Sequence, residues 1–395
     1  MKQNLTSFVL WVMTVATGLC VANLYYCQPL LHQIQNTFGA SAAVMGWIPT
    51  GTQLGYALGM FFLSPLGDRF ERRRLIFIST LVSAVCLIGV ALSPNIYFVI
   101  VLSLLLGLAT MTPQYIIPFA AHLSSPQKRG QTVGMVMSGM LLGILLARTV
   151  SGFIGDLFGW RVMFGSASVV LVILAFVLRG ALPQSEPSFS GSYVGLLKSV
   201  IQLVKELPVL RESMVFGSMM FGAFSAFWAT LIYLMESPAF NLGAKTVGLF
   251  GILGASGALA APLVGRLADR RSPRQTVGYG IAMMGISFLI YLFWGGTSLI
   301  ALSIGVVIMD VGLQVAHVSN QSRVFSLIPE ARSRLNTAYM FFYFIGGAAG
   351  SLLASIAWSQ AQWTGVCIVA LIFVLIAGTT YFFKKPAKSA AAVSS

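Results

Sequence analysis

Long apolar runs follow one another along the chain and are separated by short polar stretches. Each run has about 20 residues, which at 1.5 Å per residue lets a helix cross ~30 Å of hydrocarbon. The strands of a membrane barrel would be ~10 residues long and would alternate in polarity. The pattern therefore predicts an all-α polytopic membrane protein with twelve transmembrane helices. The runs cover about 6–30, 42–65, 75–93, 96–121, 132–155, 162–182, 212–236, 246–266, 275–294, 298–322, 335–357 and 363–383.

The longest connection divides the runs into two sets of six. We expect an N-terminal six-helix bundle at 1–182, a cytoplasmic linker with an amphipathic helix at 183–211, a C-terminal six-helix bundle at 212–383 and a cytoplasmic tail at 384–395. The linker carries an apolar stripe beside a polar one, and this indicates either a helix lying in the inner membrane interface or a plain tether. The apolar stripe consists of Val194, Leu197, Ile201 and Val204, and the polar one of Lys198, Gln202 and Lys205.

Composition supports a membrane location. Hydrophobic residues make up 57% of the chain and charged residues 9%, whereas a soluble protein carries roughly a quarter charged residues. The net charge of +14 does not indicate a nucleic-acid partner, because the basic residues lie in short loops and not on one face with interleaved aromatics. The four cysteines lie inside apolar runs without a CxxC spacing, which supports neither a metal site nor a disulfide framework.

The distribution of Lys and Arg predicts the topology. If the N-terminus is cytoplasmic, 21 of the 24 basic residues fall on the cytoplasmic side. Arg161 and Lys245 fall outside, and Arg148 lies within a run. Because Lys and Arg favour cytoplasmic loops, we expect an even number of spans with both termini inside, in the inner membrane if the chain is bacterial.

Two loop segments of the chain repeat. Asp68 and Asp269 are 201 residues apart, and each is followed by Arg one and five positions later. A second pair of similar segments begins at Pro126 and Pro329, 203 residues apart. Two repeats at nearly one offset predict two pseudo-symmetric six-helix halves with a cavity between them near the midplane.

The first of these repeats resembles the loop signature of the major facilitator superfamily, G-x-L-A-D-R-x-G-R-R. The copy at 265–270 matches it well. The copy at 64–73 keeps the acid and the arginines but has Ser64 and Glu71 where the family usually has glycine. The resemblance covers the whole chain and is greatest to the twelve-helix drug:proton antiporters. It implies the major facilitator fold and transport by alternating access.

The motif also has a physical role. A carboxylate at a tight inner turn can accept hydrogen bonds from a helix N-terminus and pair with arginines of the neighbouring half, which would hold a cytoplasmic gate in one state. The alternative is that the arginines only set topology while the acids balance charge. The gating candidates are Asp68, Arg69, Arg72, Arg73, Asp269, Arg270 and Arg274.

Asp310 is the candidate for proton coupling. It lies 12 residues into the run 298–322, close to the midplane, with Gln314, His317 and Gln321 on the same helical face. A carboxylate at this depth is costly and usually faces a cavity or a partner. Burial disfavours the charged form, so Asp310 is placed to bind and release a proton, and His317 to relay or tune it. The alternatives are an acid that only holds helices together and a histidine in a structural hydrogen bond.

Arg148 is the other charge inside a run. It would attract an anionic substrate, pair with Asp310, or extend to the outer interface with only its stem buried. The glycine-rich fifth run resembles the antiporter motif without its usual Gly-Pro pair. The fourth run lacks the arginine of many drug:proton antiporters, and the first run has no acid. Asp310 would therefore carry more of the proton coupling than in those relatives.

Polar and aromatic residues inside the runs are candidates for the walls of a substrate cavity. Amides and phenols offer hydrogen-bonding tips on apolar bodies, which suits an amphipathic organic solute, although each can equally join helices. The candidates are Asn23, Tyr26, Gln53, Tyr56, Gln114, Arg148, Trp228, Gln314, Asn336, Tyr339 and Tyr343.

No ATP-binding, metalloprotease or hydrolase motif is present, because G-x-x-x-x-G-K-[ST], H-E-x-x-H and G-x-S-x-G are all missing. We therefore expect a secondary active transporter and not an enzyme, without cofactor or metal. It would export a small organic solute in exchange for protons and work as a monomer in the lipid bilayer. A proton-linked symporter or facilitator for uptake is the alternative. A membrane sensor or embedded enzyme is a further alternative from another class.

Overall fold

The computed structural model describes residues 5–125, 127–185, 192–254 and 272–383, and within these ranges the chain forms helices and no strand. The helices are α1 (Ser7–Ala22), η1 (Gln28–Leu30), α2 (Leu31–Phe38), α3 (Ala42–Met45), α4 (Trp47–Phe62), α5 (Leu66–Arg69), α6 (Arg72–Ala91), α7 (Ile96–Ala109), α8 (Thr112–Leu123), α9 (Arg129–Phe158), α10 (Trp160–Ala181), α11 (Tyr193–Glu206), α12 (Pro208–Met235), the helix Ala244–Gly254, α14 (Pro273–Ile290), η2 (Tyr291–Gly295), α15 (Leu299–Phe325), η3 (Pro329–Ala331) and α16 (Arg332–Phe383).

The long helices match the predicted spans. Within the described ranges, eight helical segments are long and apolar enough to cross a membrane, when α7 is counted with α8 and α14 with η2. One of them, α16, contains two spans, because the backbone leaves helical geometry at Ala361 and Gln362. With α1, α4 and the helix Ala244–Gly254, they occupy the positions of the twelve predicted runs. The prediction of an all-α membrane protein is confirmed, while the predicted eighth run continues past 254, outside the described residues.

Three predicted runs are interrupted, and one of them, 42–65, is interrupted only at Gly46 between α3 and α4. The run 6–30 is not one helix, because α1 ends at Ala22 and the short 3₁₀ helix η1 follows at Gln28. The run 96–121 breaks between α7 and α8, where Pro113 occupies the first turn of α8. A proline has no N–H to donate and suits the start of a helix better than its interior.

Short polar side chains begin many of the helices. Each accepts a hydrogen bond from the backbone N–H three residues later and so satisfies one of the unpaired groups of a helix start. These caps are Thr6, Ser41, Asn95, Ser192, Ser272 and Ser298.

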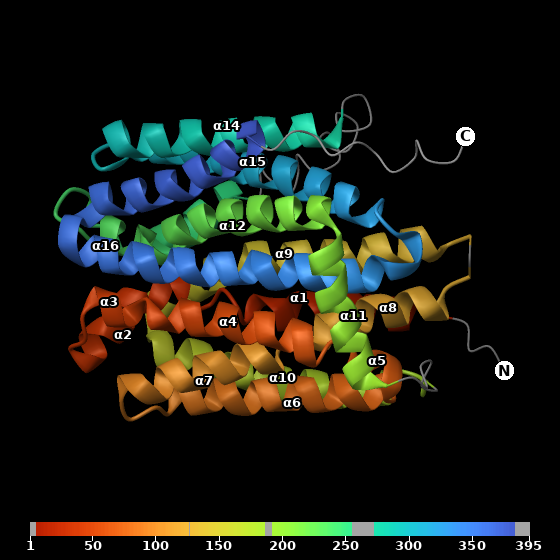
Figure 1. The fold of residues 1–395 in the computed structure, drawn as a ribbon. Coiled ribbons are helices and arrows are strands. Elements are labelled where there is room, and N and C mark those ends of the chain that lie inside the picture. The colour runs from red at the N-terminus through yellow and green to blue at the C-terminus, as the bar shows by residue number, and fades with distance from the viewer. Residues whose placement is uncertain (1–4, 126, 186–191, 255–271, 384–395) are drawn as a thin grey trace.

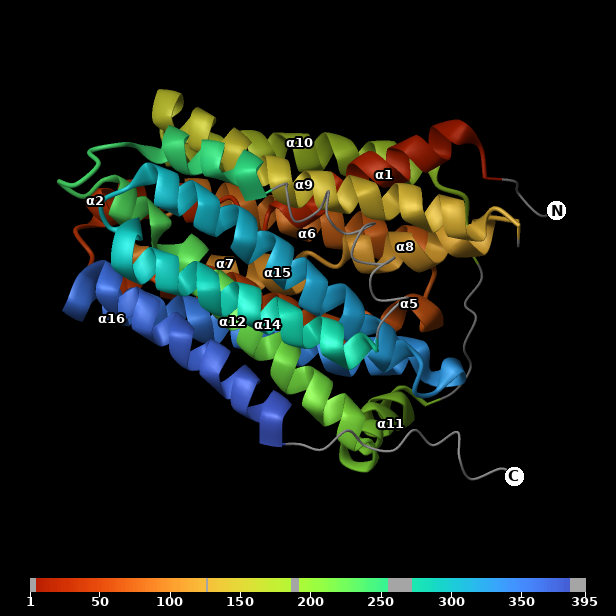
Figure 2. The ribbon, with the colours of Figure 1, turned by 90° about the horizontal axis from the view of Figure 1, so that it is seen from above.

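The helices lie roughly side by side along one long axis (Figure 1). Helices α6, α7 and α10 lie at one edge, α14 and α15 lie at the other, and α9 and α16 lie between them. We call the end where α6, α9, α14 and α16 begin the basic end, because Arg72, Arg129, Arg274 and Arg332 lie there. In Figure 2, turned by 90°, the same end carries α5 and α11.

Small residues bring neighbouring helices close together. A Cβ atom added at Gly55 of α4 would lie 2.0 Å from the carbonyl oxygen of Leu104, and one added at Gly107 of α7 would lie 2.0 Å from that of Thr52. A Cβ at Gly346 of α16 would likewise meet the backbone of α12. Close approach through small residues is how helices gain packing in lipid, where no hydrophobic force joins them.

The segment between the two sets of helices contains α11, which crosses the bundle at the basic end (Figure 1). It packs through Val200 and Leu203, which are buried. Val194 and Ile201 of the predicted apolar stripe are instead exposed, because the packed face lies about a quarter turn away from that stripe. The exposed apolar face is suited to contact lipid at the membrane surface.

Candidate functional site

Arg148 is a buried cation held against aromatic rings. It lies past the middle of α9 and is 3% exposed, so it does not extend to an interface. Its Nε donates a hydrogen bond to Gln28 Oε1 at 2.6 Å. The guanidinium carbon lies 4.1 Å from the ring centroid of Trp228, 4.9 Å from that of Tyr25 and 5.6 Å from that of Phe224. These contacts fix the cation in place, while its Nη2 is buried without a hydrogen-bond partner.

Asp310 faces the same space from the other half. It lies near the middle of α15 and is 9% exposed, and its Oδ2 is buried without a hydrogen-bond partner. The two charges attract one another. Among the ion pairs of the described residues, however, there is none between Arg148 and Asp310. In this conformation, pairing of Arg148 with Asp310 is therefore not realised.

The space between these charges is a cavity of about 110 Å³, which we call the central cavity. Both halves line it, and most of the wall is apolar or aromatic. Besides Arg148 and Asp310, its lining includes Tyr25, Leu141, Ile144, Leu145, Phe221, Phe224, Gly251, Gly254, Leu313, Gln314 and Tyr343.

The polar stripe of α15 leads from the central cavity toward the basic end. Gln314 lines the central cavity, and Gln321 lines a second cavity of about 620 Å³ at the basic end. His317 lies between them, with its Nδ1 3.2 Å from the hydroxyl of Tyr339. His317 itself lines the basic-end cavity, and a gap beside it that Leu313 and Tyr343 help to line is too small to hold water. The stripe therefore runs from the wall of one cavity to the wall of the other.

The predicted wall residues are distributed over several places. Tyr343 and Gln314 line the central cavity, while Gln114 and Asn336 line the basic-end cavity. Gln114 donates a hydrogen bond to the hydroxyl of Tyr56 at 2.8 Å. Asn336 accepts one from Gln321.

Six predicted wall residues line neither cavity: Asn23, Tyr26, Gln53, Tyr56, Trp228 and Tyr339. Gln53 donates a hydrogen bond to Ser351 at 3.2 Å and so joins α4 of one half to α16 of the other. Asn23 and Tyr26 are buried in the turn between α1 and η1, and both polar atoms of the Asn23 amide lack a hydrogen-bond partner. Spacing along a helix indicates which residues share a face, but the partner of that face depends on the packing of the halves.

The loop motif at 64–73 makes its ion pair within the first half. Arg72 donates to Asp68 at 2.9 Å and to the carbonyl of Gly67 at 3.0 Å, and Arg73 donates to the carbonyl of Leu182. The expected pairing of Asp68 with the neighbouring half is thus not present in this conformation, because Arg72 at the start of α6 binds the carboxylate from the same half. Arg69 lies 6.0 Å from the ring of Phe70. Asp269 and Arg270 lie outside the described residues.

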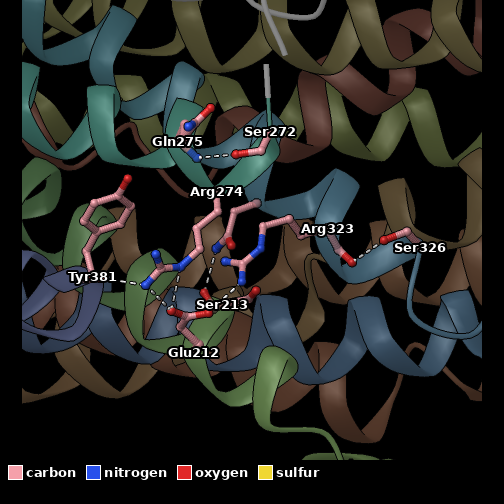
Figure 3. Close-up of polar contacts among 9 residues, drawn as sticks. Glu212, Ser213, Ser272, Arg274, Gln275, Arg323, Ser326 and Tyr381 are labelled. Carbon is pink, nitrogen blue, oxygen red and sulfur yellow. Dashed lines mark hydrogen bonds and ion pairs between the residues drawn. The ribbon is translucent and has the colours of Figure 1, made fainter. Parts of the chain in front are cut away.

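In the second half, a buried carboxylate pairs with two arginines at the basic end (Figure 3). Glu212 of α12 is 5% exposed. It accepts hydrogen bonds from Arg274 at 3.1 and 3.2 Å and from Arg323 at 2.6 Å. Arg274 also donates to the carbonyl of Tyr381 at the end of α16. The cluster therefore joins α12, α14, α15 and α16.

Glu212 was not among the residues singled out from the sequence. The available signal was an acid at the start of a run that is otherwise apolar. Gln28 and Tyr25, which contact Arg148, were also missed, because an amide or a phenol near the end of a run is common in helix packing.

At the end opposite the basic end, the two halves touch. Thr149 of α9 donates to the carbonyl of Gly248 at 2.8 Å, and Thr50 of α4 donates to that of Ala348 at 3.1 Å. His32 of α2 contacts the carboxylate of Glu236, just after α12. The described contacts thus close this end, while the larger cavity lies at the basic end.

Comparison with protein families gives one family. The model of the Major Facilitator Superfamily matches residues 10–351 and, in an overlapping match, 219–395. The chain is 42% identical over 375 residues to the "Uncharacterized transporter YgaY" of Escherichia coli O157:H7, covering 95% of both chains. It is 33% identical over 379 residues to the "Probable transporter SCO4007" of Streptomyces coelicolor, covering 95% of this chain and 87% of that one.

Solved structures share the fold. A bacterial homologue of the human lysosomal transporter Spinster, in an inward-facing and unoccupied conformation, superposes with a TM-score of 0.79 at 15% identity, covering 95% of this chain and 96% of that one. The nucleoside transporter NupG superposes with a TM-score of 0.76 at 16% identity, covering 95% of this chain and 100% of that one.

Proposed function

The chain belongs to the major facilitator superfamily and is an integral membrane transporter of small molecules, not an enzyme, and we propose that it exports a small organic solute in exchange for protons. The observation that carries this proposal is the pair of buried opposite charges, Arg148 and Asp310, which face one central cavity from different halves. Ionisable groups this deep in a membrane protein usually mark a substrate or proton path.

Asp310 is the proposed coupling group. When ionised, its carboxylate attracts a cationic group of a solute; when protonated, it no longer does. A proton and a solute cation therefore compete for one carboxylate, which makes the two exchange and not travel together. Protons entering down their gradient would displace the solute on the outer side.

The proposed transport cycle follows from the two ends of the bundle. We assign the basic end to the cytoplasm, because Lys and Arg favour that side. The solute would enter the basic-end cavity and pass His317 to reach the central cavity, with Tyr343 moving aside. Residues 1–182 and 212–383 would then rock about the central cavity, so that contacts such as that of Gln53 with Ser351 open.

The arginine clusters at the basic end are the proposed inner gate. Asp68, Arg69, Arg72 and Arg73 of the first half, with Asp269, Arg270 and Arg274 of the second, would exchange partners as this end closes. The molecule would do this as a monomer, in the inner membrane of a bacterial cell.

Transport in proteoliposomes tests the proposal. The purified protein is first screened by thermal shift against drugs, sugars, amino acids and other metabolites, and a stabilising compound is then used in transport assays. We expect an imposed pH gradient to drive this solute in the wild type, and Asp310→Asn to abolish the pH-driven part, so that any counterflow that remains no longer depends on pH. Asp156→Asn, an exposed acid at the end of α9, is the matched control. Undiminished pH-driven transport by the Asp310 variant would remove the coupling role.

A further inference from the structure

Two residues of opposite charge line the central cavity, and each has one polar atom without a hydrogen-bond partner. Arg148 Nη2 and Asp310 Oδ2 are both buried and both lack a hydrogen-bond partner. A buried charged group without a partner is expensive, so such atoms are retained where a ligand satisfies them. Because the two residues do not pair directly, the cavity keeps a positive and a negative site at separate positions.

We propose that the transported solute is a zwitterion with an apolar or aromatic body, whose carboxylate binds Arg148 and whose ammonium group binds Asp310. This inference rests on the proposed transport function and names the chemical class of its substrate. Amino acids, their derivatives and short peptides belong to this class.

The positive site is built for a carboxylate. The planar guanidinium of Arg148 is held by Gln28 on one side and by the Trp228 ring 4.1 Å away, so its orientation is fixed. An arginine fixed in this way can donate parallel hydrogen bonds that match the two oxygens of a carboxylate. The neighbouring rings of Tyr25, Phe224 and Trp228 carry no negative charge that would compete with a ligand carboxylate for the guanidinium.

Glycines pack against both charged residues. A Cβ atom at Gly251 would lie 3.2 Å from the Arg148 Cβ, and one at Gly254 would lie 3.3 Å from Asp310 Oδ1. Both glycines line the central cavity. A larger side chain at Gly254 would approach the carboxylate that the ammonium group has to reach.

The remaining wall suits an apolar body. Phe221 stacks on Tyr343 with ring centroids 4.1 Å apart, and Phe224 lies beside Phe221. Leu141 and Leu145 complete the wall from α9. Such rings and aliphatic groups bind the apolar part of a ligand, while a few polar groups fix its orientation.

A solute with one charge fits the cavity less well. A simple anion would bind Arg148 but would also face the carboxylate of Asp310, and a simple cation would face the guanidinium of Arg148. Like charges close together in a poorly hydrated site repel strongly. A zwitterion meets both charges with its opposite, and it leaves neither buried group unpaired.

Three matched series of probes test this inference on the wild-type protein in detergent at neutral pH. Each series keeps one body and varies the charge, and binding is followed by tryptophan fluorescence and by calorimetry. The phenyl series is L-phenylalanine, 2-phenylethylamine, 3-phenylpropionate and 3-phenylpropanol, and the isobutyl and indole series are built in the same way. We expect the zwitterion to bind at least tenfold more tightly than the other members in one or more series. Equal or tighter binding of the singly charged members throughout, or no binding of any zwitterion, would overturn the inference.

Two variants assign the charges. We expect Arg148→Gln to remove the preference for the zwitterion over the amine, and Asp310→Asn to remove its preference over the carboxylate; Asp156→Asn should change neither. The comparison among probes on the wild type remains decisive if a variant fails to fold. Since binding is measured without a gradient, a zwitterion that binds but is not exchanged for protons would uphold this inference and contradict the proposed antiport.

Discussion

At the residue scale, Gln28 controls the charge available at Arg148. Replacing it by glutamate places a carboxylate at the Nε of Arg148, where it neutralises the guanidinium and competes with a solute carboxylate. We therefore expect Gln28→Glu to weaken binding of L-phenylalanine by tenfold or more while leaving the protein folded. Calorimetric titration measures this effect. Unchanged affinity would show that the solute does not use Arg148.

Removing the amide has a different effect. Gln28→Ala leaves a buried charged donor without its acceptor, which costs about 1–3 kcal/mol. We expect a lower melting temperature for Gln28→Ala than for Gln33→Ala, because Gln33 makes a neutral hydrogen bond to the carbonyl of Gly155 that is only partly buried. Thermal unfolding in detergent compares the two variants. A larger drop in melting temperature for Gln33→Ala than for Gln28→Ala would contradict the role of Gln28 as the acceptor of a buried charge.

Glu212 provides a second test of buried charge. Glu212→Ala leaves Arg274 and Arg323 without their shared carboxylate, and breaking a buried pair in this way costs about 3–5 kcal/mol. The Asp68 side chain is 48% exposed and pairs with Arg72, so Asp68→Ala should cost at most about 1 kcal/mol. Melting temperatures of the two variants should therefore differ clearly. Similar values would mean that the Glu212 cluster adds little to stability.

Arg148 and Asp310 could be predicted from the sequence as functional candidates. A carboxylate such as Asp310 or a guanidinium such as Arg148 stands out within an apolar run, because lipid does not solvate it. The roles of Glu212 and Gln28 could not be predicted in this way, since each residue lies near the end of a run. Their partners come from helices that are distant in the sequence, and only the packed structure brings them together.

At the element scale, length and hydropathy predicted where the helices lie, and local chemistry determined where they end. The break between α7 and α8 follows from Pro113, which the run of apolar residues conceals. The two spans within α16 were separated correctly, because the polar stretch at Ser359, Gln360 and Gln362 interrupts the apolar pattern. The face on which α11 packs could not be predicted from the stripe alone, since its apolar residues cover more than one face and tertiary contacts bury Val200 and Leu203.

The glycines of α9 have different roles, and a pair of substitutions separates them. A Cβ at Gly143 would lie 2.2 Å from the carbonyl oxygen of Gly18 in α1, whereas one at Gly134 would meet nothing within 4 Å. We expect Gly143→Val to destabilise the fold by about 1–3 kcal/mol through overpacking. Gly134→Ala should be neutral or stabilise by about 0.5–1 kcal/mol, because alanine favours the helix. Thermal unfolding checks both, and a Gly143 variant as stable as the wild type would contradict the close α1–α9 contact.

At the scale of the whole molecule, the polar contacts between halves lie toward the end opposite the basic end. Thr149, Gln53 and His32 each reach across from one half to the other there. If the halves rock about the central cavity, these contacts have to separate in every cycle, whereas contacts within a half can persist. A covalent bond between the halves at this end should therefore stop transport without disturbing either half.

His32 and Glu236 are the positions for such a bond, because their side chains touch across the closed end. We expect the double variant His32→Cys with Glu236→Cys to lose transport when oxidised or treated with a short bifunctional maleimide, and the disulfide form to recover it on reduction. Each single variant controls for loss of the native contact, and the four natural cysteines are buried away from the reagent. Solute binding from the basic end should survive in the linked protein, since that entrance stays open. A linked protein that still transports at the wild-type rate would mean that the two halves do not separate at this end.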